Sequence, residues 1–168
     1  MTGVYYYPLI VIGCIIQFIC EERNANIMSQ YEDLLRQFVK IDNKDLAGFF
    51  FAKAQTIEGY SKQYSLIWDL VETLMCKVIV LDKMDKSEYA VIQALAVYRH
   101  GRPFDPDEFA SRLQKFVENN ADTTVMEFAF SMLPEFVRDD VVMILMCLAA
   151  VDGGISNQEN EWLSTLCF

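Results

Sequence analysis

The chain has 168 residues, of which 53% are hydrophobic and 13% aromatic. This is enough apolar surface for a sizeable core and too much for a disordered chain. The chain holds 14 Lys and Arg against 24 Asp and Glu, a net charge of −10 at pH 7. Such a charge repels the phosphates of nucleic acids, so we expect no nucleic-acid partner.

Residues 4–20 carry no charge and are predicted to form an apolar N-terminal helix within residues 1–27. At about 1.5 Å per residue the segment spans roughly 25 Å, less than a bilayer core of about 30 Å. The signature of a signal peptide, a positive charge before the apolar run and a small-residue cleavage site after it, is missing. We expect a core or interface helix first, membrane association second, and an aberrant start third.

A helix without charge around its whole circumference cannot face water on any side. We therefore expect residues 4–20 to make the protein associate, most simply as a homodimer, with another protein or lipid as the alternatives.

Residues 28–168 are predicted to form a single domain, because no Pro/Gly/Ser-rich linker divides them. Apolar residues recur there at helical spacing, and no strand pattern competes with them. The fold class is therefore all-α, a compact bundle of seven to nine helices. The stripe over 61–82 predicts the longest helix, and the nearly uncharged run 141–151 predicts a buried one. The expected helices cover residues 29–41, 45–59, 61–82, 87–100, 106–119, 122–133 and 134–151, with a last one from 156.

Helix starts and stops are indicated by familiar signals. Ser87 is positioned to cap the helix that ends at His100 and Gly101. Asp105 followed by Pro106 is a strong helix start, with an acidic N-cap and proline in the first turn. His100 would sit at a helix C-terminus, where a positive charge is favoured, so we expect a capping role rather than that of a general base.

A corner motif follows the buried helix. Its two glycines allow the backbone angles that end a helix, and an isoleucine closes the corner. Ser156 then caps the last helix, and Glu159 completes a capping box. Asp152 has no part in this structural account. The motif consists of Asp152, Gly153, Gly154, Ile155, Ser156 and Glu159.

These residues resemble the motif of the tellurite-resistance TerB-like family, in which Asp-Gly is followed by an aliphatic residue, Ser or Thr, and Glu seven positions after the Asp. The resemblance is clearest over residues 140–168. It implies a helical bundle of two related halves, with a degenerate first repeat around 90–117 in which His100 replaces the acid. It also implies that acidic residues, here Asp152 and Glu159, chelate a metal.

The chemistry of an enzyme or a cofactor protein is not indicated. The chain contains no phosphate-binding loop, no HExxH and no GxSxG motif, and it has a single histidine. Five cysteines without a CxxC pair indicate free thiols in a reducing cytoplasm. We expect no catalytic or cofactor-binding residues. The aromatic and thioether side chains expected in the core instead include Phe128, Phe130, Phe136, Met143 and Met146.

The predicted function is a non-enzymatic, cytoplasmic interaction module, which the resemblance associates with stress response or tellurite resistance. The first alternative is a sensor that binds a divalent cation through Asp152 and Glu159. The second alternative is an enzyme of unknown class.

Overall fold

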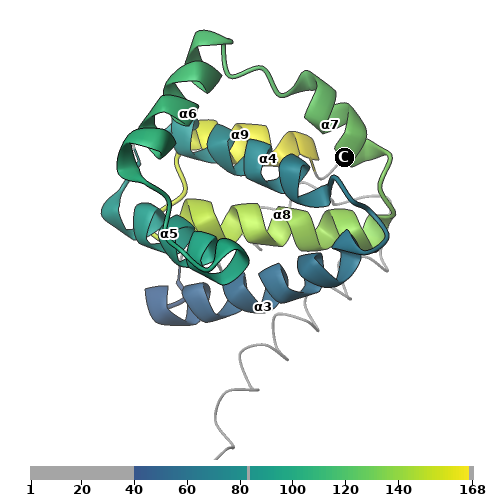
Figure 1. Cartoon of the computed structure of the whole chain (residues 1–168), viewed down its shortest axis with the longest axis horizontal. Helices are drawn as coiled ribbons and strands as arrows, with labels where there is room; N and C mark the ends of the chain where they lie inside the picture. Colours follow the sequence, from purple (N-terminus) through teal and green to yellow (C-terminus); the bar gives the residue numbers. More distant parts are fainter. Residues whose placement is uncertain (1–39, 83, 167–168) are drawn as a thin grey trace, which may run out of the picture.

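The computed structural model describes residues 40–82 and 84–166, which form seven helices and no strand. The predicted all-α fold class is confirmed for these residues. The helices, shown in Figure 1, are α3 (Asn43–Ser61), α4 (Ile67–Leu81), α5 (Lys86–His100), α6 (Pro106–Glu118), α7 (Thr124–Ser131), α8 (Glu135–Ala150) and α9 (Asn157–Leu166).

The helix α8 lies in the middle of the bundle (Figure 1), in contact with α3, α4, α5 and α9. All ten residues from Val141 to Ala150 are buried. None of them has a charged side chain, so this stretch can be surrounded by other helices at no cost in desolvated charge. The prediction of a nearly fully buried helix over this run is confirmed.

The helix predicted over 61–82 is wrong in its first turn and a half. The longest described helix is α3, and α4 begins only at Ile67. The chain turns between them, with the N–H groups of Gln63 and Tyr64 both donating to the carbonyl of Tyr60. Tyr60 and Tyr64 still pack against the same core, which preserves the apolar stripe through the turn. Gly59, where the sequence predicts the helix over 45–59 to end, lies inside α3, and residues 62–66 of the actual turn contain no glycine or proline.

The predicted helix ends are mostly observed. Asp105 caps α6 by accepting the N–H groups of Asp107 and Glu108, and α5 is followed by Gly101 at φ 72°. The predicted Ser87 cap is wrong, because α5 begins one residue earlier and Asp85 is its N-cap.

Two residues expected in the core lie at the surface. Phe130, Met143 and Met146 are buried as predicted, whereas Phe128 and Phe136 are exposed. The helix α7 has only eight residues, of which Phe130 is buried in the core and Met126 packs against the core while partly exposed. Most of its other apolar side chains therefore have no buried position to fill.

The predictions for residues 4–20, the helix over 29–41 and the domain boundary at residue 27 fall outside the described residues, apart from residues 40 and 41. Within the described ranges, no helix has the length and hydropathy to cross a membrane. Cys76 and Cys147, the two described cysteines, are free thiols.

Candidate functional site

The corner between α8 and α9 has the reciprocal hydrogen bonds that the sequence predicts. Ser156 Oγ accepts the N–H of Glu159 at 3.3 Å, and Glu159 Oε2 accepts the N–H of Ser156 at 2.8 Å. Gly153 has φ 103°, a backbone conformation that side chains with a Cβ rarely adopt. Asp152 Oδ1 accepts the N–H of Gly154 at 3.1 Å. Asp152 thus has a local structural partner that sequence analysis did not foresee.

Replacing Ser156 by alanine should lower the free energy of unfolding by about 1 kcal/mol, because the N–H of Glu159 loses its acceptor at the start of α9. Urea unfolding measures this change. Ser111→Ala, on the exposed side of α6, is the matched control and should cost nothing. Equal unfolding free energies for the Ser156 variant and the wild type would show that the cap does not stabilise the corner.

A second corner of the same construction joins α4 to α5. Here Asp85 is the N-cap, and its N–H donates to Glu88 Oε2 at 2.8 Å in a second capping box. Asp82 ends α4, as Asp152 follows α8. These three acids correspond to Asp152, Ser156 and Glu159 at offsets of 70 or 71 residues.

Sequence analysis missed this second corner. The connection between α4 and α5 has no glycine to mark it. Ser87 is itself a favourable N-cap residue, and it competes with Asp85, whose spacing to Glu88 forms the actual capping box. That spacing, with a further acid three residues before it, is the signal that could have found it. In the first repeat predicted around 90–117, the glutamate at the corresponding position is Glu108, in the first turn of α6. Glu108 is exposed, so this repeat has no corner with a buried capping glutamate. The internal duplication itself stays a prediction.

The capping glutamates of the two corners are both buried. Glu88 is 3% exposed and Glu159 is 2% exposed. Burial raises the pKa of Glu88 to about 7, with the negative charges of Glu159, Asp152 and Asp82 adding to the rise. Burial also raises the pKa of Glu159, against the hydrogen bonds from Ser156. The two corners therefore place four carboxyl groups, those of Asp82, Glu88, Asp152 and Glu159, close enough to act on one another electrostatically.

The residues predicted to hold a metal are brought near two further acids, but not into a coordination site. Across the described ranges, no three His, Cys, Asp or Glu side chains are arranged to hold a metal ion. One oxygen of Glu159 is used by the capping bond, and one oxygen of Asp152 by the Gly154 N–H. In this arrangement the four carboxyl groups have structural roles at the ends of α4 and α8 and the starts of α5 and α9.

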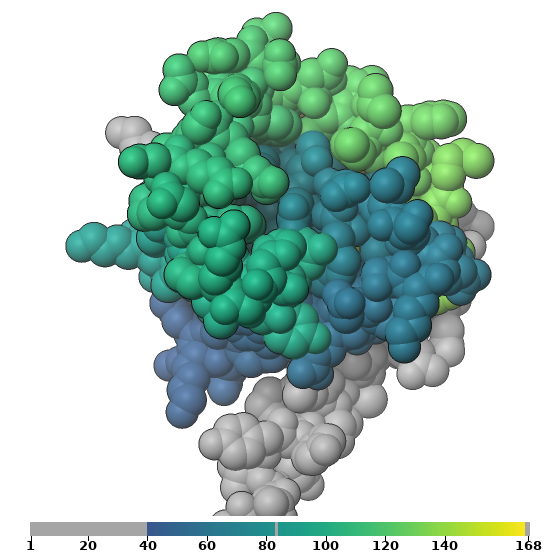
Figure 2. All heavy atoms as spheres, viewed as in Figure 1, coloured from purple at the N-terminus to yellow at the C-terminus, as the bar shows by residue number. Residues whose placement is uncertain are grey.

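The exposed side of α7 is the second notable feature. Val125, Phe128 and Met132 recur at helical spacing on one side of this region and are 68–74% exposed. We call these three residues the α7 face. Figure 2 shows α7 at the molecular surface, at the upper right of the view. On the inner side, Glu127 Oε1 accepts the Trp162 indole N–H at 2.9 Å, which ties α7 to α9.

Comparisons with known proteins give no relative: no family model, curated protein or solved structure matches this chain. The resemblance to the TerB-like family therefore stays a prediction that depends on the corner motif alone.

Proposed function

We propose that this protein is a non-enzymatic interaction module, and that its α7 face binds the same face of a second copy. The observation that carries the proposal is the exposure of Val125, Phe128 and Met132 on a helix whose other side is tied to the core. Clustered apolar side chains of this size in water favour association, and a two-fold contact is the commonest way to cover such a face.

Charge supports a second copy as the partner. A chain with a net charge of −10 repels its own copies over most of its surface. Residues 123–134 contain one charged residue, Glu127, and that side chain accepts hydrogen bonds from Thr123 and Trp162. Two copies can therefore meet at the α7 face without bringing like charges directly against each other.

Sedimentation equilibrium of the full chain at 5–200 µM tests this proposal. We expect reversible self-association that Phe128→Glu weakens at least tenfold, since a buried contact would then require burying a charge. Val97→Glu adds the same charge at an exposed apolar residue of α5 and is the matched control. A monomeric wild type, or equal weakening by both variants, would contradict the α7 contact.

The finer parts of this function come from the sequence. The uncharged segment 4–20 is proposed to add to the association, or to contact another protein or lipid. A chain starting at Met28 separates its contribution from that of the α7 face. We propose that such an assembly takes part in a stress response of the cytoplasm, a role that the resemblance of the corner motif to the tellurite-resistance family supports.

A divalent-cation sensor is the second candidate function. It is favoured by the crowding of Asp82, Glu88, Asp152 and Glu159, whose mutual repulsion a cation would relieve. Binding would require these side chains to move, because no three of them converge in the observed arrangement. Calorimetric titration with Ca²⁺, Mg²⁺, Mn²⁺ and Zn²⁺ decides the matter. Saturable binding below millimolar that Asp152→Asn abolishes would establish the sensor, and its absence would dismiss it.

A further inference from the structure

The helix α6 is weakly attached to the bundle. Its apolar residues Phe109, Leu113, Phe116 and Val117 recur at helical spacing and form one stripe, but Phe109 alone among its 13 residues is buried. A cavity of about 40 Å³ with largely apolar walls remains between this helix, α4 and α5. Side chains that line such a space lose part of their packing contacts, so less free energy holds α6 in place.

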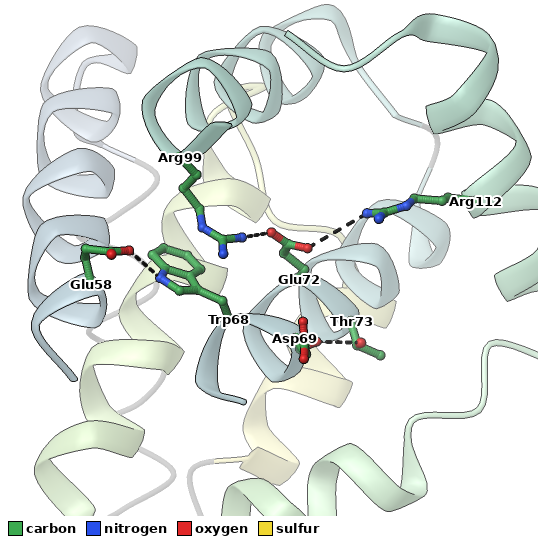
Figure 3. Close-up of polar contacts among 7 residues, drawn as sticks. All are labelled: Glu58, Trp68, Asp69, Glu72, Thr73, Arg99 and Arg112. Carbon is green, nitrogen blue, oxygen red and sulfur yellow. Dashed lines mark hydrogen bonds and ion pairs between the residues drawn. The ribbon is translucent and has the colours of Figure 1, made fainter. Parts of the chain in front are cut away.

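The helices α3, α4 and α5 are joined by a network of polar contacts (Figure 3). Trp68 Nε1 donates to Glu58 Oε2 at 2.7 Å, which links α4 to α3. Arg99 stacks on the Trp68 ring and pairs with Glu72, which links α5 to α4. Arg112 of α6 also points toward Glu72, but its Nη1 lies 3.9 Å from Oε2, beyond hydrogen-bond distance. The network therefore holds α3, α4 and α5 together without requiring α6.

Both connections of α6 contain backbone in the left-handed region. Before the helix, Gly101 has φ 72°, which glycine adopts without strain. After the helix, Asn120 has φ 59° and Ala121 has φ 48°, and within the described ranges no other residue with a Cβ has a positive φ. Alanine is disfavoured there because its Cβ approaches the following carbonyl oxygen. The observed position of α6 therefore stores backbone strain at Ala121.

Ala121 joins a segment held by α4 to the last turn of α6. On the α4 side, Lys77 Nζ donates to the carbonyl of Ala121 at 3.0 Å, and Ala121 is buried. On the α6 side, the N–H of Ala121 donates to the carbonyl of Phe116 at 2.9 Å. Because both sides constrain the same residue, its strain is released when the last turn of α6 separates from the bundle.

We propose that α6 is a cover that separates from the bundle as one unit, between hinges at Gly101 and Ala121, while α3, α4, α5 and α8 stay folded. A helix of 13 residues is marginally stable in water once its packing is lost, so α6 unfolds when it separates. The open form exposes Met75 and Ile79 of α4 and Leu95 of α5, which line the cavity in the closed form. The bundle thereby has a second apolar surface, to which the position of α6 controls access.

Native-state hydrogen–deuterium exchange of the full chain at 0–2 M urea tests the proposal. Amides of α6 should exchange together, about a hundredfold faster than the amides of α8. Their exchange should depend little on urea, because opening exposes a small part of the surface that global unfolding exposes. Exchange of α6 only at the rate of α8, or rates that fall gradually from the ends of α6 to its middle, would overturn the proposal.

Two glycine substitutions test the hinge in the same experiment. Ala121→Gly should slow exchange in α6 about threefold, because glycine relieves the strain of the closed form. Ala110→Gly, at an exposed position of α6, is the matched control and should speed this exchange about fivefold, because glycine lowers helix propensity. Global unfolding also frees Ala121, so slower exchange in α8 alone would show that the hinge stays intact when α6 opens. That result, or exchange that Ala121→Gly leaves unchanged in both helices, would overturn the proposal.

Discussion

Replacing Leu145 by alanine should lower the free energy of unfolding by about 2–5 kcal/mol, a large part of the total stability of a domain of this size. Leu145 lies in the middle of α8 and is fully buried. Because α8 is packed by α3, α4, α5 and α9, no neighbour can move in to fill the space without leaving its own contacts. Urea unfolding followed by circular dichroism measures the loss.

The control for this prediction is Val97→Ala, which removes an apolar side chain that is about half exposed on α5. It should change the free energy of unfolding by no more than about 0.5 kcal/mol. A cost at Leu145 as small as the cost at Val97 would contradict the central position of α8.

The stability of the fold should fall as the pH rises from 5 to 8, mainly because of Glu88. A carboxyl with a pKa raised from 4.5 to about 7 binds its proton more tightly in the folded protein than in the unfolded chain. Its stabilising contribution is fully present below the unfolded pKa and is lost as the pH rises through the folded pKa. After allowance for solvent screening we expect a loss of about 1–2 kcal/mol.

Glu88→Gln should remove most of this pH dependence, since a neutral amide can still accept the N–H of Asp85. Glu108→Gln, an exposed residue at the same position of the next helix, is the matched control and should keep the wild-type slope. Urea unfolding at pH 5.5, 7 and 8 gives the three slopes. A Glu88→Gln slope equal to that of the wild type would contradict the buried carboxyl cluster.

Much of the fold could be predicted because its signals are local. The uncharged run in α8 and the Asp105 cap of α6 each depend on residues close together in the sequence. A break between the helices over 45–59 and 61–82 was predicted, but its position at residues 62–66 could not be, because Tyr60 and Tyr64 keep the helical stripe on both sides of it. Hydrophobicity alone predicts burial of Phe128, but it lies two residues before the buried Phe130 and therefore on the opposite side of α7, where it is exposed.

One of the two corners of the candidate site could be predicted, again because its signal is local in the sequence. The Ser156–Glu159 capping box lies within four residues and could be seen in the sequence. The pairing of this corner with the Asp85–Glu88 box depends on how α4, α5, α8 and α9 pack, which no local pattern specifies. The exposure of the α7 face is likewise a property of the packed bundle.

Hydrogen–deuterium exchange of the full chain at 1 and 100 µM tests self-association through α7 most directly, because it needs no substitution. Amides of residues 124–132 should exchange more slowly at the higher concentration, when a second copy covers the α7 face. Amides of α6, which lies outside this contact, should exchange at the same rate at both concentrations. Exchange in α7 that is independent of concentration, in a sample that self-associates, would contradict the proposed contact.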